Sequence, residues 1–158
     1  VVAMAGASLA HSTIQSNAQV GLANRLRGGP CRVHGPDLRV RIGETGMYAY
    51  PDVTVVCGPL ELAPTRPESL ENPRAVVEVL SDTTRDYDLG AKAAHYRHRA
   101  SVQAILFIDS ERRMVQLQIR NADGTWTLSD HVDGAVRLLD VEVPIDELYE
   151  GVVGLGVS

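Results

Sequence analysis

The chain has 158 residues, 44% of them hydrophobic, which fits one globular domain with a real core and leaves little room for a second. Its net charge is −5, from 20 acidic against 15 basic residues, and this excludes a positive field over the whole molecule. Residues 1–10 are small and apolar, but they have no basic flank and are too short to span a membrane. We expect a single domain over residues 1–158 of a soluble, cytoplasmic protein.

The first half of the chain predicts one helix followed by short strands. Ser8 is a suitable helix N-cap, and apolar residues at four-residue spacing follow it as far as Leu26, before the Gly-Gly-Pro of residues 28–30. Residues 58–73 contain four prolines and predict an irregular surface loop. Three alternating or β-branched segments predict an antiparallel meander: residues 31–34, 37–42 and 50–57.

A buried strand, a helix and a second buried strand are predicted in the middle of the chain. Residues 74–81 are almost entirely apolar, the pattern of a strand that is covered on both faces of a sheet. Residues 86–99 predict a helix with basic residues in its last turn, and residues 102–109 predict the second buried strand. A hairpin, a strand and a short helix are predicted to follow, at residues 114–120, 126–130, 136–143 and 145–151.

The two cysteines, Cys31 and Cys57, lie alone in strand-like segments, without the close spacing that zinc ligation needs. Free cysteine is among the most buried residue types and behaves as a small apolar side chain. We therefore expect both cysteines to be buried, reduced thiols.

Two carboxylates are candidates for chemistry, because burying an ionised acid among valines costs several kcal/mol unless a cation or hydrogen-bond donors compensate. Glu78 lies inside the apolar strand, and Asp52 lies in the earlier strand-like segment. If these strands are neighbours, both acids converge, and with the backbone carbonyl of Val79 they offer the oxygen ligands that Mg²⁺ or Mn²⁺ takes. Lys92, one turn after Asp88 on the next helix, would add a cation. Metal-assisted phosphodiester hydrolysis needs these groups.

Each residue also has a structural explanation. Lys92 could be only a partner of Glu78, Asp88 a helix cap or a partner of Lys92, and Asp52 a turn residue. The alternative function is a non-catalytic binding or assembly module, and the test between them is whether the three residues point into one concave pocket. A glycosidase-type carboxylate pair lacks support, because only 4% of the residues are aromatic.

Three segments in order carry a family resemblance: YPDVTVVC, NPRAVVEVLSDTTRDYDLGAKAAHYR and VEVPIDELYEGV. They resemble the Uma-two family of restriction endonuclease-like proteins, within the PD-(D/E)xK nuclease superfamily, over residues 4–151. The resemblance implies an α/β (α+β) fold with a restriction endonuclease-like core, in which helices flank a mixed sheet with extra hairpins. It also implies a metal-dependent endonuclease that hydrolyses phosphodiester bonds of nucleic acid. We expect DNA as the substrate, although the sequence itself does not distinguish DNA from RNA.

The resemblance assigns the two metal-binding acids of the superfamily to Asp52 and Glu78, with Mg²⁺ or Mn²⁺ as the cofactor. The superfamily lysine normally lies two residues after the second acid, where this chain has Leu80, so its role falls to Lys92 on the helix. Four further residues are expected to surround these groups: His11, Asp37, Asp88 and Tyr96. For Asp37 the alternative is a turn-capping residue, and for His11 it is a solvated surface residue.

Residues 102–109 and the C-terminal segment carry more apolar surface than one small domain is expected to bury, so we expect a homodimer. Phosphate contacts dominate nucleic-acid affinity, so an acidic chain needs a local basic surface. A dimer could gather five arginines along one groove: Arg25, Arg27, Arg39, Arg41 and Arg97.

Overall fold

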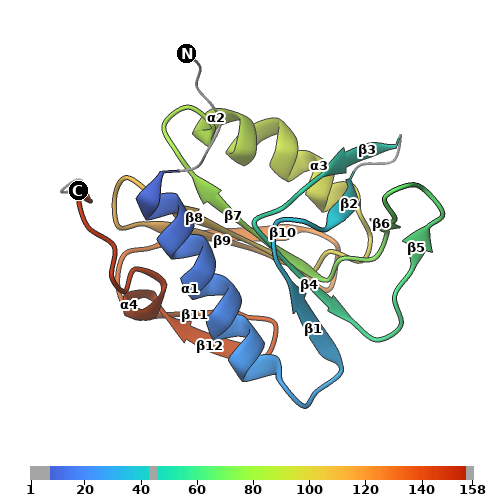
Figure 1. Ribbon diagram of the computed structural model, residues 1–158, viewed down its shortest axis with the longest axis horizontal. Helices are drawn as coiled ribbons and strands as arrows, with labels where there is room; N and C mark the ends of the chain where they lie inside the picture. The colour runs from blue at the N-terminus through green and yellow to red at the C-terminus, as the bar shows by residue number, and fades with distance from the viewer. Residues whose placement is uncertain (1–7, 43–45, 156–158) are drawn as a thin grey trace.

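Figure 1 shows the protein as a computed structural model, which describes residues 8–42 and 46–155. Its centre is a six-stranded sheet in the order β1-β4-β7-β8-β9-β10. β7 and β8 run parallel, and the other neighbouring pairs are antiparallel, so the mixed sheet implied by the resemblance is confirmed. The strands are β1 (Cys31–His34), β4 (Val53–Cys57), β7 (Ala75–Leu80), β8 (Ala104–Asp109), β9 (Val115–Arg120) and β10 (Trp126–His131).

Helices cover both faces of this sheet. Side chains of β7 alternate between two hydrophobic clusters, one packed against α1 and α4 and the other against α3. None of the helices in the described residues is both long and apolar enough to cross a membrane. The helices are α1 (Leu9–Leu26), α2 (Arg85–Tyr87), η1 (Asp88–Lys92), α3 (Ala93–His98) and α4 (Ile145–Leu148).

The long helix α1 lies across one face of the sheet (Figure 1) and matches its prediction. The Ser8 side chain accepts a hydrogen bond from the backbone N–H of His11 at 3.1 Å, which caps the helix. Ile14, Ala18 and Leu22 are buried against the sheet, and each buried Ile or Leu contributes about 1.5–3 kcal/mol. His11 continues this buried stripe toward the N-terminus, so packing also fixes the direction in which it points.

The helix predicted at residues 86–99 is present as α2, η1 and α3, which follow one another without a break. Its middle part, η1, has π geometry, in which the N–H of Ala93 bonds to the carbonyl of Asp88 five residues earlier. Such turns are frequent at functional sites, and this one begins at Asp88 and ends at Lys92. No residue pattern in the chain predicted the π turn.

A second sheet, in the order β3-β2-β6-β5, corrects the predicted meander and the predicted loop. β1 and β4 do pair, as predicted. β2 lies in the second sheet, because Val40 and Ile42 are buried against Leu70 and α3 and not beside β1. The loop at residues 58–73 contains two strands, which its prolines keep to two residues each. The strands are β2 (Arg39–Ile42), β3 (Met47–Ala49), β5 (Leu62–Ala63) and β6 (Ser69–Leu70).

The hairpin β9–β10 and the short helix α4 are confirmed, but the single strand predicted at residues 136–143 is wrong. This segment is a hairpin, β11 (Ala135–Leu138) and β12 (Val141–Pro144), which packs against α1 and α4. Leu139 turns the chain with φ at 56°, a left-handed conformation that leucine rarely adopts. The usual Gly or Asn signal of such a turn is therefore absent.

The prediction of two reduced thiols is also wrong, because Cys31 and Cys57 form a disulfide. The two residues lie directly opposite each other in the β1–β4 register. The N–H of Gly58 donates to the carbonyl of Pro30 at 3.1 Å, so the cysteines are a non-hydrogen-bonded pair, where opposite Cα atoms come closest. Both cysteines are only partly buried. Residue spacing alone could not show this register.

The apolar strand on which the homodimer was predicted is used inside the chain itself. β8 lies between β7 and β9, and all six of its residues are buried. At the C-terminal end, Ile145 and Leu148 of α4 are buried in the cluster under α1. β8 therefore offers no apolar surface to a second copy, whereas Val153, after α4, is 72% exposed.

Candidate active site

Asp52 and Glu78 come together where β4 begins and β7 ends. The β4–β7 register pairs Val53 with Val77, so the next position along the two strands sets Asp52 opposite Glu78. Asp52 Oδ2 accepts a hydrogen bond from the backbone N–H of Val79 at 2.8 Å. This bond holds the Asp52 carboxylate against the strand that carries Glu78.

Glu78 is a buried carboxylate with two partners on the helix above it. Its Oε2 lies 2.8 Å from Lys92 Nζ and also accepts a hydrogen bond from the Tyr96 hydroxyl. Its other oxygen, Oε1, accepts no hydrogen bond from the described residues. Burial raises the pKa of Glu78 to about 7, against the lowering effect of the Lys92 ammonium and the Tyr96 hydroxyl. Glu78 is therefore poised to change its charge near neutral pH.

Lys92 is the only lysine of the chain, whose other fixed cations are arginines. Its Nζ also lies 3.8 Å from Asp88 Oδ1. Burial lowers the pKa of Lys92, but the negative charges of Glu78, Asp88 and Asp52 outweigh burial and raise the pKa above its usual value. A lysine ammonium is a compact point charge, unlike the planar fork of arginine. The presence of a single lysine in the chain was therefore a sequence signal that Lys92 has a specific role.

Asp88 and Tyr96 lie on either side of Lys92 along the helix, as predicted. Burial raises the pKa of Asp88, while Lys92 and the hydroxyl of Thr84 lower it. Tyr96 is fully buried, and burial followed by the charge of Glu78 raises its pKa well above 10. Both side chains therefore act on Lys92 and Glu78 rather than facing solvent. Sequence reasoning missed Thr84.

His11 and Gln15 approach Asp52 from α1. His11 Nε2 lies 3.4 Å from Asp52 Oδ1, and the hydrogen bond with Asp52 raises the pKa of His11. The Gln15 side-chain amide donates to the backbone carbonyl of Asp52 at 3.2 Å. His11 thus contacts the site, as the resemblance implied. Gln15 was missed, although it lies one turn after His11 on the same helix face.

Asp37 does not join these residues. It is exposed in the turn between β1 and β2. Within the described part of the chain it makes no hydrogen bond or ion pair with Asp52, Glu78 or Lys92. The turn position matches the structural alternative for Asp37, and an outer role at the site gains no support from its placement.

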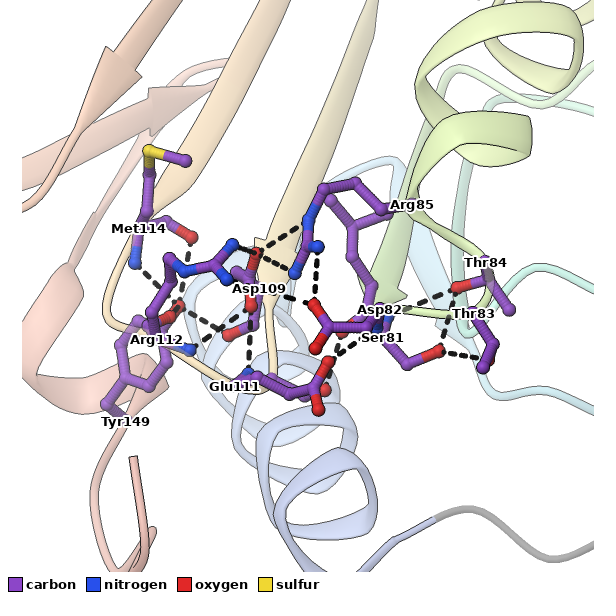
Figure 2. A network of polar contacts seen from close by, with 12 residues as sticks. Ser81, Asp82, Thr83, Thr84, Arg85, Asp109, Glu111, Arg112, Met114 and Tyr149 are labelled. Atoms are coloured by element: carbon purple, nitrogen blue, oxygen red, sulfur yellow. Dashed lines mark hydrogen bonds and ion pairs between the residues drawn. The ribbon is translucent and has the colours of Figure 1, made fainter. Parts of the chain in front are cut away.

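A polar network fixes the loop between the strand of Glu78 and the helix of Lys92 (Figure 2). The buried carboxylate of Asp109, at the end of β8, accepts hydrogen bonds from Arg85 at 2.6 Å and from Arg112 at 3.3 Å. The Tyr149 hydroxyl donates to the backbone carbonyl of Asp109 at 2.7 Å. Arg85 begins the helix, so this network sets the helix against β8. No motif in the sequence identified it.

The candidate residues are largely covered. The exposed fractions of the side chains are 4% for Glu78, 15% for Asp52, 16% for Lys92 and 22% for His11. Four hollows in the described surface lie elsewhere: one between α1 and α4, one at residues 64–68, and two that are lined by Cys57. None of these four is lined by Asp52, Glu78 or Lys92. The concave pocket that would distinguish a nuclease from a non-catalytic binding module is therefore not among them.

Within residues 8–42 and 46–155, no three His, Cys, Asp or Glu side chains form a group that could hold a metal ion. The candidate donors are instead two carboxylates, of Asp52 and Glu78, and one backbone carbonyl. The N–H and C=O of a strand residue point the same way, so the Val79 carbonyl faces Asp52 as its N–H does. Mg²⁺ is usually held by one or two carboxylates together with water. The donor chemistry therefore fits an open Mg²⁺ site and not a closed cage.

A family model shows the family of this chain, and a solved structure shows its fold. The sequence profile of the Uma2 family, described as "Putative restriction endonuclease", matches residues 1–146. The uncharacterized protein slr1290 of Synechocystis sp. is 33% identical over 156 residues, which cover 96% of this chain and 80% of that protein. The uncharacterized protein sll1609 of Synechocystis sp. is 27% identical over 130 residues, 82% of this chain and 73% of that protein.

A solved structure resembles the whole arrangement. It is the crystal structure of "a putative nuclease belonging to DUF820" from Anabaena variabilis, with a TM-score of 0.69 and 17% sequence identity. The match covers 94% of this chain and 84% of that one. At this identity the likeness shows a shared fold, a mixed sheet flanked by helices.

Proposed function

Because this chain belongs to the Uma2 family, described as "Putative restriction endonuclease", we propose that it is a metal-dependent endonuclease that hydrolyses phosphodiester bonds of nucleic acid. The observation that carries the proposal is the convergence of Asp52, Glu78 and Lys92 from three separate segments of the chain. One buried and one half-buried acid have no need to meet an ammonium for stability alone, because an apolar group of similar size is often as stable.

Asp52, Glu78 and the Val79 carbonyl would hold the cofactor, Mg²⁺ or Mn²⁺. When bound, such an ion polarises a phosphoryl oxygen and lowers the pKa of a water molecule. Asp52 is already held by the Val79 N–H, and Glu78 is oriented by the Tyr96 hydroxyl, so little rearrangement of the carboxylates would be needed. Fixed ligands of this kind favour catalysis because their geometry is set before substrate arrives.

Lys92 would supply positive charge to the reacting phosphate. In the structure its ammonium is paired with Glu78, and a cation bound by Glu78 would weaken that pairing through charge repulsion. The ammonium would then be available to a phosphoryl oxygen or to the attacking water. Asp88, 3.8 Å away, would keep Lys92 over the site when Glu78 is engaged elsewhere.

Nucleic acid, and DNA rather than RNA, is the proposed substrate, with a homodimer as the acting form. The support for a dimer is electrostatic, since the chain carries a charge of −5 and needs a shared basic surface. Two of the arginines expected to form that surface are paired within the chain: Arg25 with Glu147, and Arg41 with Glu71. Any basic groove would therefore depend on the remaining arginines.

A non-catalytic binding module is the second candidate. The observation that favours it is the closed Lys92–Glu78 pair, in which both charges are satisfied and Glu78 is almost wholly covered. A binding module would keep this pair as a structural element.

Calorimetric titration with Mg²⁺ and with Mn²⁺ tests the proposed ligands. The native chain should bind, and Asp52→Asn with Glu78→Gln should abolish binding, because both substitutions keep the shape but remove the charge. A matched control is Asp130→Asn, an exposed acid of β10. Unchanged affinity in the double variant would refute the ligand assignment, and metal binding without cleavage of DNA or RNA would favour the binding module.

A further inference from the structure

We propose that the Cys31–Cys57 disulfide undergoes thiol–disulfide exchange with a small anionic thiol, which binds in the arginine-lined hollow beside it. The disulfide joins the far end of β4, the strand that begins directly after Asp52. The proposal does not depend on nuclease activity.

The disulfide is accessible from outside the molecule. Cys31 and Cys57 are both only partly buried, and both line one surface hollow. Cys57 also lines a second hollow. β1 is the outer strand of the six-stranded sheet, so no further strand covers Cys31 from its free edge. Exchange requires this access, because a thiolate must approach one of the two sulfur atoms.

The hollow that contains both cysteines is positively charged. Three arginines line it, Arg25, Arg27 and Arg74, against one acid, Asp140. Arg25 is neutralised by Glu147 at 2.6 Å, but Arg27 and Arg74 are exposed and form no ion pair with a described residue. Such a concentration is unexpected in a chain whose net charge is −5. The local field attracts anions and stabilises a thiolate.

The two features together select the ligand. The arginines favour a negative group, and the disulfide gives a reason for that group to carry a thiol. The hollow measures about 620 Å³, within the range of sites for small molecules. A carboxylated peptide thiol of the size of glutathione meets all three requirements.

The reaction balances without any other reagent. A thiolate attacks Cys31 or Cys57, the S–S bond breaks, and the other cysteine leaves as a thiolate that takes a proton from water. A second small thiolate attacks the small-thiol sulfur of the mixed disulfide. That S–S bond breaks, the protein cysteine leaves as a thiolate that takes a proton from water, and the two small thiols form a disulfide. The protein gains two electrons and two protons as two thiols are oxidised. Accessible disulfides of this type are the ones that cycle in a reducing compartment.

The test compares an anionic and a cationic thiol. The full native chain is incubated with glutathione or with cysteamine, and the cysteines that become free are alkylated and counted by mass spectrometry over time. The same rates are measured for Arg27→Ala with Arg74→Ala, and for Arg66→Ala, an exposed arginine outside the hollow. Each rate is divided by the rate of the native chain with the same thiol, so the difference in intrinsic reactivity between the two thiols does not affect the result.

We expect the double substitution to lower the glutathione rate about tenfold while the cysteamine rate stays level or rises, because two attractive charges are lost. The Arg66→Ala chain should match the native one. Equal effects on both thiols, no effect on glutathione, or no exchange by the native chain at millimolar glutathione would each overturn the proposal.

A second measurement covers the case in which the double variant does not fold. Raising the salt concentration with the native chain should slow the glutathione reaction and not the cysteamine reaction, since salt screens charge attraction. Equal salt dependence for the two thiols would refute the role of the arginines. Cys31→Ser with Cys57→Ser provides the zero point of the alkylation assay.

Discussion

Replacing Lys92 with methionine separates a catalytic lysine from a structural one. Methionine keeps most of the length of the side chain but removes the ammonium that lies 2.8 Å from Glu78 Oε2. Lys92 is the main group that lowers the pKa of Glu78, and that pKa is already about 7. In Lys92→Met the pKa of Glu78 therefore rises further, and at pH 7 the carboxyl group is protonated.

The magnitude of the change follows from this titration. Above the new pKa the variant has a buried carboxylate without its cation, a loss of about 3–5 kcal/mol of stability. At pH 5 Glu78 is protonated in both proteins, so the loss of stability should be much smaller. Metal affinity at pH 7 should fall, because a protonated Glu78 is a poor ligand, and raising the pH should restore it.

The decisive assay is turnover at saturating Mg²⁺ and at a pH where the variant binds metal as well as the native chain does. We expect the rate to stay at least about 100-fold lower, the usual scale for one preorganised electrostatic group. Arg137→Met, at an exposed arginine of β11, is the control for loss of a positive charge. Native turnover in the metal-saturated variant would refute a catalytic role for Lys92 and leave it as the partner of Glu78.

Three further substitutions test other parts of the structure. Glu78→Gln mimics the neutral form of the carboxyl group. Because the raised pKa of Glu78 stabilises the folded protein only while the group is protonated, the stability of the native chain relative to this variant should fall by on the order of 3 kcal/mol as the pH rises from 4.5 to about 7. Thermal unfolding measures this difference, and a difference that does not change with pH would contradict the burial effect. Cys31→Ser with Cys57→Ser should lower stability by about 3.5 kcal/mol and the Tm by about 10 °C, since the disulfide closes a 26-residue separation; an unchanged Tm would show that the bond is not formed. Asp109→Asn should cost about 3 kcal/mol in urea unfolding, because Arg85 loses its buried partner; a change below about 0.5 kcal/mol would mean that the network does not hold the helix.

Elements with a strong local pattern were predictable. α1 has a cap and an apolar stripe, and β7 and β8 are unbroken apolar runs, so each carries its own signal within a few residues. The helix from Arg85 to His98 was equally clear in extent, though its π turn was not.

Features that depend on pairing between distant segments were not predictable. Nothing local distinguishes β2 as a strand of the second sheet, and its placement follows from Leu70 and α3, which lie far along the chain. The disulfide has the same cause, because Cys31 and Cys57 meet only through the β1–β4 register. Leu139 shows a different limit, a turn residue without turn chemistry.

The candidate site combines both situations. Glu78 was visible as an acid in an apolar strand. The strand and helix pattern already placed Asp52 and Lys92 beside it, and the resemblance then assigned the same residues to the site. Gln15 and Asp109 were invisible, since each acts through one contact that exists only after folding. The contacts of the candidate groups thus come from α1, β7 and the helix of Lys92, which share no sequence pattern.

The proposed nuclease function is tested by measuring cleavage of nucleic acid by the native chain and by Glu78→Gln, each with Mg²⁺ or with a chelator. Duplex DNA, single-stranded DNA and RNA would be used, because the substrate class is part of the proposal. We expect the native chain with Mg²⁺ to cleave at least one of them, DNA before RNA, and we expect chelator or Glu78→Gln to remove the activity. Cleavage by Glu78→Gln at the native rate, or by the native chain in chelator, would contradict it, and so would a metal-bound native chain that cleaves none of the three.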